Sequence, residues 1–169
     1  HDATIDATTN GSGNVADYTL EELRSFSMER GGKVYLENGE PVRVPTLAEA
    51  LNACKGKVYV NLDLKAVASR ADLIKVIQDT GMQGQVMLYC SGSAAKDYQS
   101  KDPSIAVHPH IGSASDIDQY ASCPGAKLFQ YNYSLWVERT SIAKDIRAKG
   151  YLSYSNLLNY DAQTLAGNY

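Results

Sequence analysis

The stretch Lys57-Val-Tyr-Val-Asn-Leu-Asp-Leu-Lys65 decides the fold class of this chain. Its apolar residues alternate at positions 58, 60, 62 and 64, which is the period of a β-strand. A helical pattern follows over residues 69–80, and Gly81 is placed to end it. A second apolar strand, Gln85–Cys90, comes next. The order strand, helix, strand predicts two parallel strands joined by a crossover helix.

The same alternation continues toward the end of the chain. The sequence predicts strands at residues 104–108, 127–131 and 151–155, and helices at 93–100, 115–122 (with Asp118 as capping partner), 137–149 and 161–166. Short strands at even spacing favour an α/β (β/α)₈ TIM barrel over a doubly wound sheet. No Gly-x-Gly-x-x-Gly follows a strand, which disfavours dinucleotide binding. Since a barrel has eight strands, we expect an incomplete one, without the first strands and the last, in a longer natural protein.

The segment before this alternation carries loop, turn and helix signals. Residues 3–17 are rich in Thr, Asn and Gly and are predicted to be loop. Helices are predicted at 19–26 and 46–54, each with a Thr and a Glu in capping-box spacing. Residues 33–44 are predicted to be extended around an Asn-Gly turn. We therefore treat residues 1–169 as one partial barrel domain.

Composition and charge exclude several classes of partner. The net charge is −3 and the pI about 5.6, without a basic patch, so nucleic acid is not an expected partner. No apolar run has the length of a membrane span, and no signal peptide is recognisable. Cys54, Cys90 and Cys123 lack metal-ligand spacing. We expect free, buried thiols, although one disulfide with one thiol left over is an alternative.

Two groups of polar residues follow the predicted strands, where the active site of a barrel lies. Asn61, Asp63 and Lys65 share one face of their strand, and the carboxylate beside the ammonium suits a metal–phosphate site. The alternative for Asp63 and Lys65 is an ion pair without a catalytic role. His108 and His110, in His-x-His spacing, could bind a transition metal. The alternative is one loop histidine and one packed histidine.

A third candidate is the pair His1-Asp2 at the start of the chain. Histidine is suited to proton transfer near neutral pH, and the adjacent Asp2 could orient it. On spacing alone such a pair is as well explained by an inert histidine.

Residues 1–65 resemble the glycerophosphodiester phosphodiesterase family. Each motif is weak alone, but their order and spacing are specific, and the resemblance continues more loosely to the end of the chain. The matching stretches are His1-Asp2, Asp6-Ala7-Thr-Thr-Asn10-Gly11 with Gly13, Tyr18-Thr-Leu-Glu-Glu-Leu23, Pro45-Thr46-Leu47-Ala-Glu49 and Asn61-Leu-Asp63-Leu-Lys65.

The resemblance implies metal-dependent hydrolysis of a glycerophosphodiester, a small molecule, to an alcohol and glycerol 3-phosphate. It implies His1 as a general acid/base, Lys65 as a second catalytic residue and Asp63 as a ligand of Ca²⁺ or Mg²⁺. It also places Tyr154 and Asn156 near the substrate. Extracytoplasmic members of the family favour an envelope location.

The sequence also departs from the family pattern. The first catalytic histidine and the Glu-x-Asp metal ligands of the family lie upstream of its His-Asp motif, so we expect the chain 1–169 to be inactive alone. Ala7 replaces a family Arg, and Asp63 is one methylene shorter than the usual Glu. These departures leave open a non-catalytic barrel that binds phosphodiesters or polyols. A transition-metal hydrolase built on His108 and His110 is a third alternative.

Overall fold

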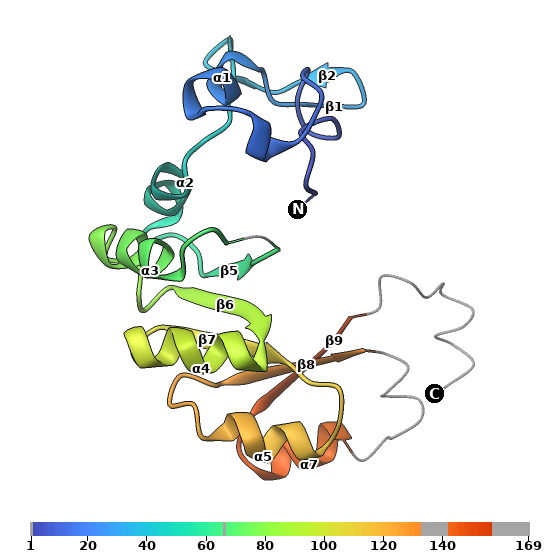
Figure 1. Ribbon diagram of the computed structural model, residues 1–169, viewed down its shortest axis with the longest axis vertical. Coiled ribbons are helices and arrows are strands. Elements are labelled where there is room, and N and C mark those ends of the chain that lie inside the picture. The colour runs from blue at the N-terminus through green and yellow to red at the C-terminus, as the bar shows by residue number, and fades with distance from the viewer. Residues whose placement is uncertain (1, 66, 133–141, 157–169) are drawn as a thin grey trace, which may run out of the picture.

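The computed structural model describes residues 2–65, 67–132 and 142–156, and Figure 1 shows their arrangement. Residues 2–46 form a lobe of loops, short hairpins and a helix at one end of the molecule. A parallel sheet with its helices occupies the other end, and helix α2 (Leu47–Cys54) lies between the two parts. The large buried core belongs to the sheet and its helices.

The sheet has five strands in the order in which they occur along the chain. They are β5 (Val60–Asp63), β6 (Val86–Ser91), β7 (Ala106–His110), β8 (Leu128–Asn132) and β9 (Leu152–Asn156), and every neighbouring pair is parallel. A doubly wound sheet changes its strand order at the switch point, and a barrel does not. The consecutive order therefore agrees with a sector of a barrel.

Helices cover one face of this sheet. They are α3 (Arg70–Asp79), α4 (Gly92–Lys101), α5 (Ser115–Ala121) and α7 (Ile142–Ala148), which alternate with the strands along the chain. Val86, Leu88 and Cys90 are buried in the shared core, whereas the residues between them in β6 are more exposed and point to the opposite face. None of the described helices is long and apolar enough to cross a membrane.

Capping interactions explain where the N-terminal helices begin. Thr19 starts α1 (Leu20–Ser25) and Thr46 starts α2, and each forms a complete capping box with the Glu three residues later. Both predicted capping boxes are confirmed. Ser69 caps α3 through a bond from the Asp72 N–H, and Gly81 follows the helix with φ of +65°.

Two short hairpins complete the N-terminal lobe. The predicted turn in residues 33–44 is confirmed, since β3 (Leu36–Glu37) pairs with β4 (Glu40–Pro41) across Asn38-Gly39. Asn38 and Gly39 both have positive φ, as two-residue hairpin turns require. A hairpin of β1 (Glu29–Arg30) and β2 (Lys33–Val34) was not predicted, although its two turn glycines at 31 and 32 carry the same signal.

Two predictions near β7 are wrong in detail. Strand β7 begins at Ala106, not at residue 104, and includes Pro109, whose missing N–H leaves a gap in the bonding to β8. Asp118 does not cap α5. The carboxylate of Asp116 instead accepts the N–H groups of Gly112 and Ser113 (2.8 and 2.9 Å), because it is in the first turn and within reach of that loop.

The remaining predictions divide into confirmed and untested ones. The three cysteines are free thiols, with Cys90 and Cys123 buried and Cys54 partly buried. Of the predicted helix 137–149, the described part forms α7. Residues 137–141 and the predicted helix 161–166 lie outside the described residues.

Candidate active site

The sheet face turned away from the helices carries polar side chains from every strand, and we call it the inner face. Residues paired in register lie side by side on neighbouring strands. Register places Asp63 beside Tyr89, Tyr89 beside His108, His110 beside Gln130, and Gln130 beside Tyr154. The inner face is therefore a continuous polar and aromatic surface.

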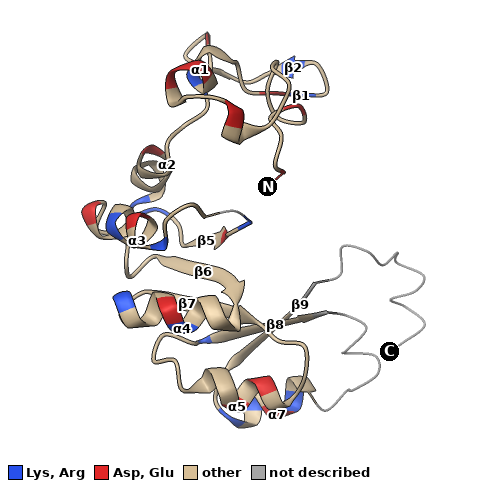
Figure 2. Ribbon diagram, viewed as in Figure 1, with Lys and Arg blue, Asp and Glu red and all other residues tan. Residues whose placement is uncertain are grey.

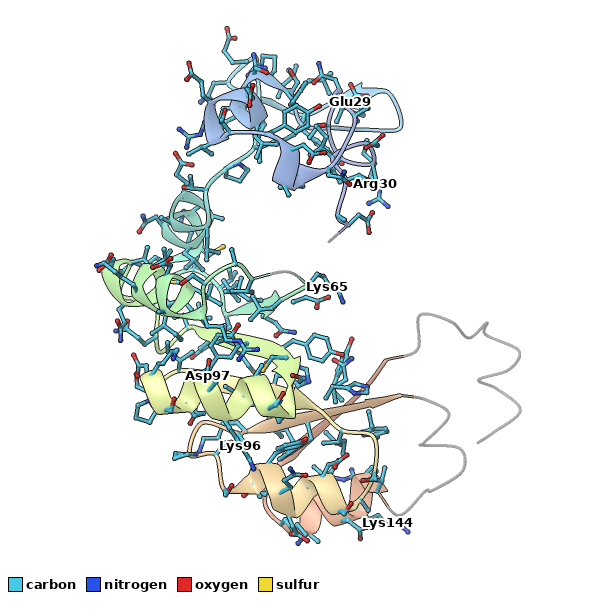
Figure 3. All side chains as sticks on the ribbon, viewed as in Figure 1. Glu29, Arg30, Lys65, Lys96, Asp97 and Lys144 are labelled. Atoms are coloured by element: carbon cyan, nitrogen blue, oxygen red, sulfur yellow. The ribbon has the colours of Figure 1, made fainter. Side chains whose placement is uncertain are left out.

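Charge on this surface is concentrated at the end of β5. Strands β6 to β9 contain no Lys, Arg, Asp or Glu, as Figure 2 shows. Asp63 is the last residue of β5, and Lys65 follows two positions later, at the tip labelled in Figure 3. Lys65 Nζ lies 3.0 Å from Asp63 Oδ1, with both side chains 44% exposed. The predicted pairing of these two groups is thus present and open to solvent.

A hollow of about 460 Å³ lies at the carboxyl ends of β5, β6 and β7. This is the end of the strands at which barrel enzymes hold their substrates. Its lining residues are Asp63, Leu64, Lys65, Tyr89, Cys90, Ser91, Gly92, His110, Gly112, Asp116 and Tyr120. Of its two carboxylates, that of Asp116 already holds two backbone N–H groups, whereas that of Asp63 faces Lys65.

The two histidines of β7 differ in environment. His108 is 1% exposed, and neither ring nitrogen has a hydrogen-bond partner among the described residues. Burial, followed by the charge of His110, lowers the pKa of His108 to about 4. His110 lines the hollow beside Lys65. The strand-end position predicted for the pair therefore holds for His110, whereas His108 is a buried neutral residue of the inner face.

The N-terminal motif residues shape their own loop. The carboxylate of Asp6 accepts the N–H of Gly13 (3.0 Å), and the side-chain oxygen of Asn10 accepts the N–H of Ser27 (2.8 Å). A Cβ at Gly11 would come within 2.7 Å of a neighbouring aromatic ring, so only glycine fits there without a shift. The Asp, Asn and Gly positions of this motif are explained by loop structure.

A second hollow, of about 190 Å³, lies in the N-terminal lobe next to Asp2. Ala7, which stands where the resemblance expects Arg, is one of its lining residues, together with Ile5, Leu23 and other mainly apolar side chains. His1 itself lies outside the described residues, so its predicted acid/base role remains a prediction.

The two residues predicted to lie near the substrate, Tyr154 and Asn156, lie on β9. Tyr154 lies on the inner face and is 52% exposed, and its ring centre is 5.9 Å from that of His108. Asn156 is the last residue of β9. Tyr154 is not part of the hollow that contains Asp63 and Lys65.

Sequence reasoning missed Tyr89 and Gln130. Gln130 Nε2 donates a hydrogen bond to the Tyr89 hydroxyl (3.1 Å), and the Tyr89 ring centre is 5.8 Å from Lys65 Nζ. The sequence signal that could have identified Tyr89 is the alternation of β6. Met87, Tyr89 and Ser91 are offset by one from the buried core residues of this strand, so they lie on its opposite face.

The described residues do not by themselves complete a metal site. Within residues 2–65, 67–132 and 142–156, no group of three or more His, Cys, Asp or Glu side chains could hold a metal ion. Asp63 offers one accessible carboxylate, but Ca²⁺ takes six to eight oxygen ligands and Mg²⁺ six. Any cation bound here would need further ligands from water, substrate or other parts of the protein.

The chain is similar to proteins of one known family. Residues 1–161 match the model of the glycerophosphoryl diester phosphodiesterase family. A glycerophosphodiester phosphodiesterase of Caldanaerobacter subterraneus is 32% identical over 119 residues, which are 66% of this chain and 46% of that protein. The chain thus spans about half the length of this curated relative.

Solved structures agree on the fold. The crystal structure of a glycerophosphodiester phosphodiesterase from Agrobacterium tumefaciens matches with a TM-score of 0.69 at 22% identity, over 92% of this chain and 65% of that one. A glycerophosphoryl diester phosphodiesterase from Parabacteroides distasonis matches over the same shares with a TM-score of 0.61, also at 22% identity. The prediction of an incomplete α/β barrel is confirmed.

Proposed function

The chain belongs to the glycerophosphoryl diester phosphodiesterase family, and from this premise we propose that the whole protein hydrolyses glycerophosphodiesters to an alcohol and glycerol 3-phosphate. The observation that supports the proposal best is the exposed Asp63–Lys65 pair beside the hollow at the carboxyl ends of the strands. A phosphodiester is an anion, and an accessible ammonium group at the mouth of a barrel is suited to bind it.

Lys65 supplies positive charge for the phosphoryl oxygens in this proposal. Negative charge on those oxygens grows as a nucleophile approaches phosphorus, so a fixed cation stabilises the transition state more than the ground state. Lys65 forms an ion pair with the carboxylate of Asp63, the last residue of β5, and this contact holds its ammonium group at the hollow.

Proton transfer is assigned to histidine. One imidazole takes the proton of the attacking hydroxyl, which belongs to water or to the 2-hydroxyl of the glycerol. The second imidazole gives a proton to the alkoxide as its bond to phosphorus breaks. His1 is proposed as one of the two, on the basis of its place in the family motif.

A requirement for Ca²⁺ or Mg²⁺ is part of the proposal, with Asp63 as one ligand. Its support is the accessible carboxylate at the hollow and the resemblance over Asn61–Lys65, in which Asp63 stands where the family usually has Glu. The described residues do not complete a metal site, so the other ligands would come from water, the substrate or other parts of the protein.

The test is the release of glycerol 3-phosphate from glycerophosphocholine by the full-length protein, with and without EDTA. Turnover that stops with EDTA and returns with excess Ca²⁺ or Mg²⁺ is the expected result. No turnover with glycerophosphocholine, glycerophosphoethanolamine or glycerophosphoglycerol would contradict the hydrolase, and full turnover in EDTA would contradict the cation.

A second candidate is a barrel that binds phosphodiesters or polyols without cleaving them. The observation in its favour is that the Asp63 carboxylate is directly paired with Lys65 in the described structure, as a non-catalytic ion pair would be. An inactive wild-type protein that binds glycerophosphocholine, and gains turnover in Asp63→Glu, would favour this candidate. Turnover by the wild type would exclude it.

A further inference from the structure

Tyr89 lies in the middle of the inner face, between the charged pair and the two histidines. It is paired in register with Asp63 on one side and with His108 on the other. Its ring centre is 5.8 Å from Lys65 Nζ, 5.3 Å from the His108 ring and 6.4 Å from the His110 ring. One side chain of β6 therefore lies beside groups of β7 and of the segment that follows β5.

The far end of Tyr89 is fixed by a strand that is not its neighbour. Gln130 on β8 donates from Nε2 to the Tyr89 hydroxyl (3.1 Å), so the phenol side chain crosses β7. Gln130 is 5% exposed, and a buried amide that has found a partner keeps its position. Burial raises the pKa of Tyr89 against the opposing effect of Lys65, so the phenol stays neutral at physiological pH.

An exposed lysine such as Lys65 is held more closely when a second group contacts its ammonium. Its side chain is 44% exposed, and a lysine in that situation samples many rotamers. The Asp63 carboxylate holds the ammonium from one side at 3.0 Å. Lys65 Nζ lies over the face of the Tyr89 ring, 5.8 Å from the ring centre. This is within the range of about 6 Å over which the quadrupole of an aromatic ring attracts a cation.

We propose that Tyr89 is a positioning residue for Lys65. Its ring, fixed from behind by Gln130, restricts the ammonium group to the hollow where it meets a phosphoryl group. Tyr89 acts through Lys65 and takes no part in proton transfer. The assignment rests on the proposed function, because it names what prepares Lys65 for the phosphate.

The test measures the binding of inorganic phosphate to the full-length protein by calorimetry. Position 89 carries in turn Phe and phenylalanines with one, two and three ring fluorines. Fluorine weakens the negative face of the ring with little change in its size, so the series varies the attraction for Lys65 and leaves the packing nearly constant. We expect Tyr89→Phe, which loses the hydrogen bond from Gln130, to bind phosphate about threefold more weakly than the wild type, and the trifluoro variant about tenfold more weakly than Tyr89→Phe.

Two comparisons separate positioning from simple packing. In a Lys65→Ala background the fluorine series should leave phosphate binding unchanged, because the cation that it acts on is gone. The same series at Tyr98 is the matched control, since that ring lies 5.7 Å from the Arg70 guanidinium in the helix layer, away from the hollow. We expect no change in phosphate binding from fluorination at Tyr98.

The assignment is overturned if phosphate affinity does not follow the fluorine content at position 89. It is equally overturned if the series has the same slope with and without Lys65. Turnover is measured separately on the same variants. If phosphate affinity follows the fluorine series but the protein has no turnover, the positioning role of Tyr89 stands and the hydrolase is rejected. If the protein turns over substrate but phosphate affinity does not change along the series, the hydrolase stands and the positioning role is rejected.

Discussion

The ammonium group of Lys65 lies 3.0 Å from the carboxylate of Asp63, and each side chain is 44% exposed. An ion pair so open to water contributes about 0–1 kcal/mol to stability. The other four strands of the sheet, β6 to β9, contain no Lys, Arg, Asp or Glu. The pair lines the hollow at the carboxyl ends of β5, β6 and β7, where the proposed function expects the phosphodiester.

Lys65→Ala should lower kcat/KM for glycerophosphocholine by about 10²–10³-fold in the full-length protein, because the transition state loses its positive partner. Lys75→Ala is the matched control. Lys75 forms an exposed ion pair with Asp79 on α3, so its removal deletes a lysine pair without touching the hollow. Equal activities of the two variants would reject the catalytic role of Lys65.

The pH dependence of stability should reveal the buried His108. Its pKa of about 4 in the folded protein lies below that of an unfolded histidine, about 6.5. The unfolded state therefore binds more protons between these two values, and the free energy of unfolding falls as the pH falls from 6.5 to 4. The contribution of this residue is fully present above pH 6.5 and amounts to roughly 3 kcal/mol.

His108→Phe should remove this part of the pH dependence, because phenylalanine does not titrate. The measurement is urea unfolding of the full-length protein at pH 4.5 and pH 7, in the wild type and the variant. If the free energy of unfolding changes by the same amount between pH 4.5 and pH 7 in the wild type and in the variant, His108 is not the group responsible.

Gly92→Ala should destabilise the protein by about 1–3 kcal/mol. A Cβ at Gly92 would lie 1.8–2.3 Å from the Tyr120 ring, so the ring or the start of α4 must move. Tyr120→Ala in the same chain should relieve most of the added cost. Gly84→Ala is the control, because a Cβ there meets nothing within 4 Å. Similar thermal midpoints for the two alanine variants would contradict this account of Gly92.

Thr46→Ala should destabilise helix α2 by about 1 kcal/mol, because the hydroxyl accepts the Glu49 N–H in a capping box. Glu49 also forms an ion pair with Arg24 on α1, and its pKa is lowered to about 2, mainly by the backbone N–H of Thr46. Hydrogen exchange of amides 47–54 is the direct measurement. Thr46→Ser keeps the cap and should exchange like the wild type, so rapid exchange in both variants would point away from capping.

The order of strands and helices could be predicted from the sequence because each element carries its own signal. Alternation in β5, capping boxes before α1 and α2, and Gly81 after α3 depend on residues close together in the chain. The errors are of a different kind. Asp118 has the right spacing to cap α5, but the loop geometry favours Asp116, and Lys149, the residue directly after α7, pairs with Asp118 instead.

The candidate site could be predicted in part for the same reason. Asp63 and Lys65 are two residues apart, and their common face follows from strand periodicity. The link from Tyr89 to Gln130 joins residues 41 positions apart, on strands separated by a third. No local pattern specifies such a contact, since it depends on the register of β6, β7 and β8.

The sequence by itself determined the class of fold, the family motifs and the acid–ammonium pair at the end of β5, because short-range periodicity and motif order encode them. Only the tertiary structure decided that His108 is buried and neutral while its neighbour His110 reaches the hollow. It also decided that Lys65 rests against the Tyr89 ring. Burial and ring contacts are set by which strands become neighbours, and that depends on packing over the whole sheet.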